Sequence, residues 1–168
     1  MITELVTQWF NYYLNDYWES VSDPRTAKLP FVSIGLGKMI SIMSSYLILI
    51  KIILPSYMKH RKPFSLRTIM LIYNTVMVIA NGYLFTMGLS FCKWGLIFLD
   101  FNYPDQNDRS SHTMKILRTE WIFWMTRFMD LLDTVFFALR KKDSQITFLH
   151  LYHHTVVPIL CWLCLKVN

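Results

Sequence analysis

An uninterrupted apolar run constrains this chain more than any other feature of its sequence. Residues 68–91 hold no Asp, Glu, Lys or Arg over 24 consecutive positions. A helix of about 20 mainly apolar residues, rising about 1.5 Å per residue, is long enough to cross the hydrocarbon core of a bilayer. A single run of this kind also suits a buried helix of a soluble bundle, so the remaining sequence decides between the two.

Three further stretches of similar length repeat the pattern. Residues 31–54 are apolar except for Lys38 and Lys51, which lie toward the ends and can extend to the headgroups. Residues 144–165 contain three histidines but no Asp, Glu, Lys or Arg, and residues 119–139 carry four charged side chains. Four such stretches in 168 residues predict one all-α membrane domain, residues 1–168, folded as a polytopic transmembrane helical bundle. The predicted spans are about 31–54, 68–91, 119–139 and 144–165.

The composition agrees with a membrane protein and argues against two other classes. Charged residues make up 17% of the chain, against about 25% in an average soluble domain, and 54% are hydrophobic, which excludes intrinsic disorder. The net charge of +6 would suit nucleic-acid binding, but the cations adjoin the apolar runs and form no separate basic stripe. We therefore expect membrane lipid, and no nucleic acid, as a partner.

The basic residues also predict the orientation in the membrane. The 13-residue loop 55–67 holds four of them, and the cluster Arg140, Lys141 and Lys142 follows two spans later on the same side. The positive-inside rule assigns these dense basic loops to the cytosol. Residues 1–30 then form a luminal segment, whose aromatic-rich stretch 5–18 suits the headgroup level, where Trp and Tyr are enriched.

The third predicted span carries a polar face made of Arg127, Asp130, Asp133 and Thr134. On a helix, Arg127, Asp130 and Thr134 share one side, and Asp133 flanks it. An ionised side chain in a bilayer costs several kcal/mol unless it faces protein or a wet cavity, so these residues should point inward. Two interpretations remain open. Arg127 and Asp130 are either a structural ion pair, or part of the polar wall of a buried reaction chamber.

The fourth predicted span carries three histidines in the pattern His-x-x-His-His. The spacing of His150, His153 and His154 puts all three on one helix face within one turn. An imidazole near neutral pH can be a base, a nucleophile or a metal ligand. Three histidines on one face therefore predict a functional cluster, hereafter the histidine box.

Three classes of membrane protein use such a box. A membrane desaturase or hydroxylase with two irons needs several boxes, whereas this chain has five histidines and one box. The other two classes are a transporter with a proton relay and an acyl transferase with an imidazole nucleophile. Cys161 and Cys164 form one Cys-x-x-Cys pair in an apolar helix, where packing is the ordinary role, and Cys92 has no expected luminal partner. We predict no metal site and no cofactor.

A longer run around the histidine box is similar to a known family. Residues Leu131 to His154 (LLDTVFFALRKKDSQITFLHLYHH) closely resemble the signature of the very-long-chain fatty acid elongases, which are condensing enzymes of the endoplasmic reticulum membrane. Further segments match the same family, namely residues 23–26 (DPRT), residues 61–67 (RKPFSLR) and the pair Tyr73-Asn74. The resemblance covers nearly the whole chain.

The resemblance implies a reaction and roles for the histidines. The family condenses a long-chain acyl-CoA with malonyl-CoA, releases CO2 and CoA, and forms a 3-oxoacyl-CoA that is two carbons longer. On this basis His153 is the expected acyl acceptor, with His150 and His154 orienting groups or supplying acid–base function. The expected partners are acyl-CoA and malonyl-CoA, together with other elongases or elongation enzymes in a homo- or hetero-oligomer.

The cytosolic cations are candidates for holding the CoA phosphates. They adjoin the spans, so the alternative is that they serve membrane topology alone. The candidates are Arg61, Lys62, Arg140, Lys141 and Lys142.

The chain departs from the family in one motif and in length. The family's Lys-x-x-Glu-x-x-Asp-Thr reads Arg127-x-x-Asp130-x-x-Asp133-Thr134 here, which keeps the charges but changes the donor geometry. Family members have seven spans, and four are predicted here. Two hypotheses follow. The chain is the front part of a longer elongase, or it is a short product that is inactive and acts only as a partner of full-length elongases.

Overall fold

A computed structural model describes residues 2–91 and 105–167 of the chain, so Cys92 lies outside the described residues. All regular structure within these ranges is helical, which confirms the predicted all-α class. In chain order the elements are helix α1 (Ile2–Asn11), the π-helical turn η1 (Tyr12–Asp16), α2 (Tyr17–Ser20), α3 (Leu36–Ile48), the π-helical turn η2 (Leu49–Ile53), α4 (Leu54–Met58), α5 (Arg67–Phe91), α6 (Ser111–Leu139), the 3-10 turn η4 (Asp143–Gln145) and α7 (Phe148–Val167).

Three helical segments are long and apolar enough to cross a membrane. They are Leu36–Met58, Arg67–Phe91 and Phe148–Val167, and they correspond to the first, second and fourth predicted spans. The first begins five residues later than predicted, because Phe31 has a φ of 65° and residues 31–35 form a turn. The fourth begins at Phe148 because residues 143–145 form a separate turn. Helix α6 contains the third predicted span and has 29 residues, but its charged side chains make it less apolar.

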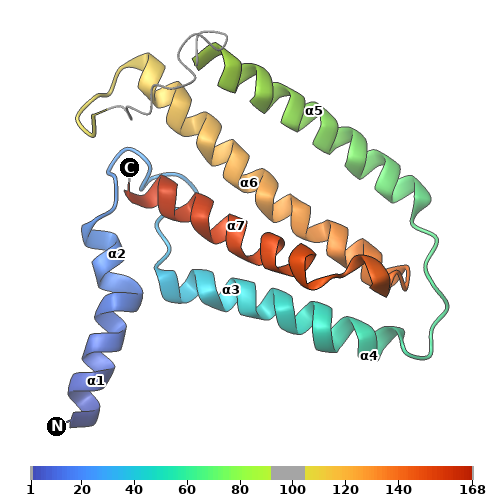
Figure 1. Ribbon diagram of the computed structural model, residues 1–168. Helices are drawn as coiled ribbons and strands as arrows, with labels where there is room; N and C mark the ends of the chain where they lie inside the picture. Colours follow the sequence, from blue (N-terminus) through green and yellow to red (C-terminus); the bar gives the residue numbers. More distant parts are fainter. Residues whose placement is uncertain (1, 92–104, 168) are drawn as a thin grey trace.

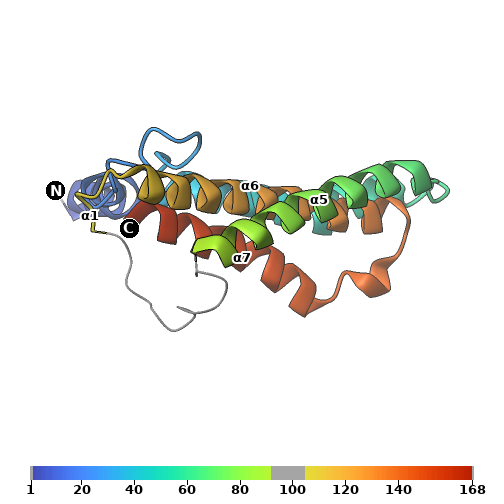
Figure 2. The ribbon, with the colours of Figure 1, turned by 90° about the horizontal axis from the view of Figure 1, so that it is seen from above.

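The long helices lie side by side, and α6 is the central element. It packs against α5, α4 and α7, and α7 lies out of the plane of the others when the bundle is viewed from above (Figure 2). The α1–α2 segment lies across one end of the bundle, close to the C-terminus (Figure 1). We call this the α1 end and the opposite one the α4 end. Helix α1 exposes apolar side chains such as Leu5 and Trp9, as an interfacial membrane helix does.

The first span stays continuous through a proline. Pro55 has no N–H, and its ring would clash with the carbonyl of the residue four positions earlier in a regular helix. The preceding turn, η2, is widened, and the N–H of Leu54 donates to the carbonyl of Leu49, five residues earlier. A π-helical turn of this kind absorbs a local mismatch without ending the helix. The span therefore runs four residues further than predicted, to Met58.

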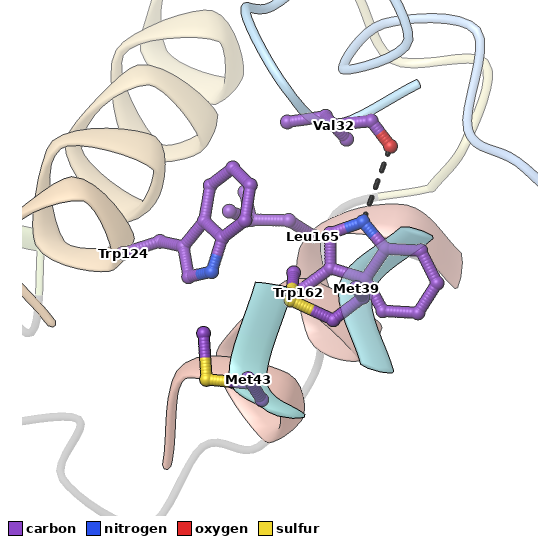
Figure 3. Close-up of a cluster of buried hydrophobic side chains, with 6 residues drawn as sticks. All are labelled: Val32, Met39, Met43, Trp124, Trp162 and Leu165. Atoms are coloured by element: carbon purple, nitrogen blue, oxygen red, sulfur yellow. Dashed lines mark hydrogen bonds between the residues drawn. The ribbon is translucent and has the colours of Figure 1, made fainter. Parts of the chain in front are cut away.

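The main hydrophobic core lies toward the α1 end and joins α3, α6 and α7 (Figure 3). The indole N–H of Trp162 donates to the carbonyl of Val32 at 3.3 Å, and that of Trp124 donates to the carbonyl of Pro158 at 2.9 Å. Each buried indole therefore contributes apolar area and has its polar group satisfied. The fully buried members are Val32, Met39, Met43, Trp124, Trp162 and Leu165.

The segment DPRT caps the C-terminal end of α7. The backbone N–H of Asp23 donates to the backbone carbonyl of Lys166 at 2.8 Å. The hydroxyl of Thr26 donates to the backbone carbonyl of Leu165 at 2.7 Å. Both carbonyls belong to the last helical turn, where intrahelical donors are missing. The guanidinium of Arg25 binds the carboxylate of Asp23 at 2.8 Å, and the side chains of both are fully buried. It also donates to two carbonyls of residues 105–108, at 2.7 and 3.0 Å.

Helix α6 begins at a capped serine. The hydroxyl of Ser110 accepts a hydrogen bond from the backbone N–H of Thr113 at 3.3 Å, which satisfies one of the free donors of the first turn. The hydroxyl of Thr113 and the backbone N–H of Ser110 both donate to Asp108 and hold the pKa of its carboxyl below the usual range. The ionised carboxylate is therefore the form that fits this turn.

Gly35 lies where η1 approaches the start of α3. A Cβ at this position would come within 2.8 Å of the carbonyl oxygen of Leu14 and 2.7 Å of the side chain of Asn15. We therefore expect Gly35→Ala to push η1 away from α3 and to lower the free energy of unfolding by about 1–3 kcal/mol. The measurement is unfolding in detergent micelles. Gly82→Ala on α5 is the control, because its Cβ would meet nothing within 4 Å, and equal losses would contradict the prediction.

Candidate functional site

The histidine box lies in the first turns of α7 and brings its three rings together. The ring centroids of His150 and His154 are 4.2 Å apart, and those of His153 and His154 are 5.4 Å apart. His150 and His154 are half-buried, whereas His153 is exposed. The predicted cluster therefore exists as a contiguous group, and its members differ in how far they are open to a ligand.

One polar residue of α6 contacts the box directly. The Oγ1 of Thr134 lies 2.8 Å from the Nε2 of His150, and Thr134 is fully buried. The hydroxyl of Tyr46, on α3, donates to the same Oγ1 at 2.7 Å. Tyr46 was not predicted from the sequence, because a tyrosine in an apolar span is an ordinary packing residue.

The charged residues of α6 form an ion pair that faces two helices. The guanidinium of Arg127 lies 2.9 Å from the carboxylate of Asp130, as the spacing of three residues predicted. It also donates to the side-chain oxygen of Asn81 on α5 at 3.0 Å and stacks over the ring of Phe123, 4.6 Å from its centroid. The pair therefore attaches α5 to α6. Asn81 was missed, although an amide within an apolar span was a usable signal.

The carboxylates of α6 adjoin the point where α6 contacts the histidine box. Thr134, whose Oγ1 lies 2.8 Å from the Nε2 of His150, directly follows Asp133, and Asp130 lies one helical turn earlier. The structural interpretation is confirmed, because the Arg127–Asp130 pair binds α5 through Asn81. The polar wall of a reaction chamber stays a prediction.

Tyr73 packs against α6 from α5. Its hydroxyl donates to the backbone carbonyl of Met129 at 3.1 Å, and its ring packs edge-on against Phe136 with centroids 5.3 Å apart. Its neighbour Asn74 points elsewhere and lines a cavity at the α4 end. The two residues of the family-like pair Tyr73-Asn74 therefore have different surroundings, since Tyr73 contacts α6 and Asn74 lines the cavity.

The cavity at the α4 end contains two arginines. It has a volume of about 600 Å³ and is lined by Arg67 and Arg140, together with apolar residues that include Met70. Arg140 follows α6 directly, six residues after Thr134, or about 9 Å along a helix axis. The cavity therefore lies at the same end of the bundle as the histidine box. Arg67 was missed, because nothing in the sequence separates it from the other cations of its loop.

The other predicted cations do not join this cavity. Arg61 stacks over the ring of Tyr57, with the guanidinium carbon 4.1 Å from the centroid. Lys141 lines a second cavity of about 290 Å³ between α4 and α6, and Lys62 and Lys142 are exposed. Of the five candidates, Arg140 is the one that the structure brings beside Arg67.

The neighbouring histidines do not form a metal site. Within residues 2–91 and 105–167, no three His, Cys, Asp or Glu side chains are grouped so that they could hold a metal ion. Cys161 and Cys164 are both free thiols on α7, one half-buried and one exposed.

Comparison with known proteins gives one family and several relatives. A family model described as ELO, the GNS1/SUR4 family, matches residues 36–168. Very long chain fatty acid elongase 1 of Mus musculus is 36% identical over 151 residues, which are 87% of this chain and 52% of that protein. Very long chain fatty acid elongase 7 of Rattus norvegicus is 32% identical over 167 residues, or 98% of this chain and 57% of that protein. Very long chain fatty acid elongase 4 of Homo sapiens is 33% identical over 150 residues, which are 88% of this chain and 46% of that protein. The chain thus spans about half the length of the curated relatives that it matches.

Proposed function

Because this chain belongs to the ELO family, the GNS1/SUR4 family, we propose that the protein condenses long-chain acyl-CoA with malonyl-CoA in very long chain fatty acid elongation. The product is a 3-oxoacyl-CoA that is two carbons longer. The proposed location is the endoplasmic reticulum membrane, with the α4 end in the cytosol and the α1 end in the lumen. The basic residues gathered at the α4 end support this orientation.

One observation carries the proposal for the site, namely that the histidine box on α7 contacts the polar face of α6, where the Oγ1 of Thr134 lies 2.8 Å from the Nε2 of His150. Acyl transfer needs a nucleophile that accepts the acyl group and later releases it, and a neutral imidazole does both. His153 is the proposed acceptor. It is the exposed member of the box, whereas the Nε2 of His150 is already bound by Thr134.

The reaction then proceeds in two balanced steps. In the first, a ring nitrogen of His153 attacks the thioester carbon, the C–S bond breaks, and the CoA thiolate leaves and takes up the N–H proton that the acylated ring releases. In the second, malonyl-CoA loses CO2, and the electron pair of the broken C–C bond becomes a carbanion stabilised by its thioester. The carbanion attacks the acyl carbon, the C–N bond to His153 breaks, and the departing ring nitrogen takes up a proton from water. His154, whose ring contacts both other rings, is placed to exchange protons during these steps.

The arginine cavity is the proposed site of CoA phosphates, for which Arg67 and Arg140 supply charged donors. We expect Arg140→Gln to raise KM for acyl-CoA about tenfold with a smaller change in kcat, because a charge-assisted hydrogen bond to the bound substrate is lost. The measurement is initial rate against acyl-CoA concentration. Lys59→Gln, in the neighbouring basic loop, is the control. If both variants raise KM equally, general surface charge and not this cavity is responsible.

The proposed activity is tested by expressing the chain in a host that lacks its own elongases. Malonyl-CoA-dependent formation of 3-oxoacyl-CoA by the isolated membranes, absent from membranes without the chain, is the expected result. Failure of these membranes to form the product would overturn the proposal that this chain catalyses condensation.

The alternative to condensation is that the protein acts only as a partner of longer elongases. Co-purification with a full-length elongase, together with unchanged product formation when His153 is replaced, would support this second function over the first.

A further inference from the structure

A line of two hydrogen bonds connects three helices and ends at the histidine box. It runs from the hydroxyl of Tyr46 on α3 to Thr134 on α6 at 2.7 Å, and from there to the Nε2 of His150 on α7 at 2.8 Å. We propose that Tyr46 is a positioning residue, which acts through Thr134 to hold His150 in the tautomer that carries its proton on Nδ1. The importance of this tautomer for catalysis rests on the proposed function, whereas the assignment of the tautomer does not depend on any activity.

The direction of the two bonds follows from the donors available. A hydroxyl has one proton to donate and two lone pairs to accept with. Tyr46 donates its proton to Thr134, which leaves the proton of Thr134 for another acceptor. Thr134 is fully buried, and the Nε2 of His150 lies within hydrogen-bond distance. The Nε2 must then be the acceptor, so the proton of the neutral ring is on Nδ1.

The opposite direction leaves a buried donor without an acceptor. If His150 donated from Nε2 to Thr134, there would be two arrangements. Thr134 would accept from both neighbours and its own proton would need another acceptor, or Thr134 would donate to Tyr46 and the phenolic proton of Tyr46 would need one. Among the described residues, no further partner is recorded for either hydroxyl. Tyr46 is only 7% exposed, so water cannot readily replace that acceptor. A buried unsatisfied donor is costly, which favours the first direction.

Packing fixes the distance that this argument needs. Tyr46 belongs to a second buried cluster that joins the three helices around the hydrogen-bonded line. Because packed side chains of this kind have little room to move, Tyr46 and Thr134 cannot separate without opening the cluster. The members are Tyr46, Ile50, Leu54, Ala138 and Leu151.

This assignment divides the work of the box. The lone pair of the Nε2 of His150 is engaged by Thr134, so that nitrogen cannot also attack a thioester. His150 is then the anchored member, and its ring, 4.2 Å from that of His154, fixes the orientation of its neighbour. The spacing of the three histidines along the sequence does not contain this distinction.

The test is nitrogen NMR of the histidine rings in the 168-residue chain, labelled with 15N-histidine and embedded in lipid nanodiscs. A His150→Gln variant identifies the signals of His150. At a pH where the ring is neutral, we expect about a tenfold excess of the form with bare Nε2 and protonated Nδ1. A His150 that is protonated on Nε2 would overturn the proposal, whether or not the chain has condensing activity.

Variants then separate the role of Tyr46 from general packing. Tyr46→Phe keeps the ring but removes the hydroxyl, and we expect it to reduce the single tautomer to a mixture. Thr134→Val should shift the proton to Nε2, and Thr134→Ser should restore the original form. Tyr152→Phe, an exposed tyrosine on α7, is the matched control and should leave the spectrum unchanged. An unchanged His150 spectrum in Tyr46→Phe would refute the positioning role.

Discussion

Replacing His153 with alanine should reduce malonyl-CoA-dependent condensation by at least about a hundredfold in membranes that contain the active protein. The reason is that the acyl group would have no nitrogen to bind after it leaves CoA. His150 cannot substitute if its Nε2 is held by Thr134 as proposed, and the half-buried His154 is less open than His153. The measurement is the rate of 3-oxoacyl-CoA formation at saturating concentrations of both substrates.

A matched control and a chemical readout sharpen this prediction. His112→Ala, at the start of α6 and far along the helix from the box, should retain wild-type turnover. Incubation with acyl-CoA alone should leave an acyl group on the peptide that contains His153, detectable by mass spectrometry after rapid proteolysis. Retained turnover in His153→Ala, or an acyl group on another residue of the box, would disprove the assignment.

Replacing Arg25 with alanine should lower the free energy of unfolding by about 3–5 kcal/mol, the largest stability effect that we expect. The change leaves the carboxylate of Asp23 buried without its guanidinium, and it removes the donor from two carbonyls of residues 105–108. Asp23 also caps the end of α7, so a displaced carboxylate would disturb the last turn of that helix. The measurement is reversible unfolding in mixed detergent micelles.

Two further variants show whether the geometry of Arg25 or only its charge is responsible. Arg25→Lys keeps the charge but lacks the planar fork that reaches both the carboxylate and the loop, so we expect an intermediate loss. Arg109→Ala, an exposed arginine nearby, should change stability by no more than about 0.5 kcal/mol. A loss in Arg25→Ala no larger than that of Arg109→Ala would show that the buried pair does not hold this end of the bundle.

The positions of the helices were largely predictable, and their ends were not. Apolar length is a local property, so the runs at 68–91 and 144–165 identified α5 and α7 without knowledge of any partner. The first span was misplaced at both ends for specific reasons. Residues 31–35 are not helical although Val32 and Ile34 pack in the core, and the widened turn η2 allows the helix to pass Pro55. Neither effect changes the hydropathy of the sequence, so the ends of this span could not be predicted from it.

The site was predictable where its residues share one helix. The spacing of His150, His153 and His154 required a single face, and the spacing of Arg127 and Asp130 allowed an ion pair. The roles of Asn81 and Tyr46 were less predictable, because each residue is hydrogen-bonded to a side chain of α6 and lies on a different helix itself.

The sequence by itself determined that this chain is a helical membrane protein with three histidines on one face of one helix and charged residues on one face of another. It did so because helix periodicity and apolar length are fixed by neighbours along the chain. Only the tertiary structure decided that Arg127 binds α5, that Arg140 shares a cavity with Arg67, and that a line from Tyr46 reaches His150. These contacts depend on how far apart three packed helices lie and how each is rotated. That rotation is set by complementary packing of side chains over the whole bundle, which no single stretch of sequence contains.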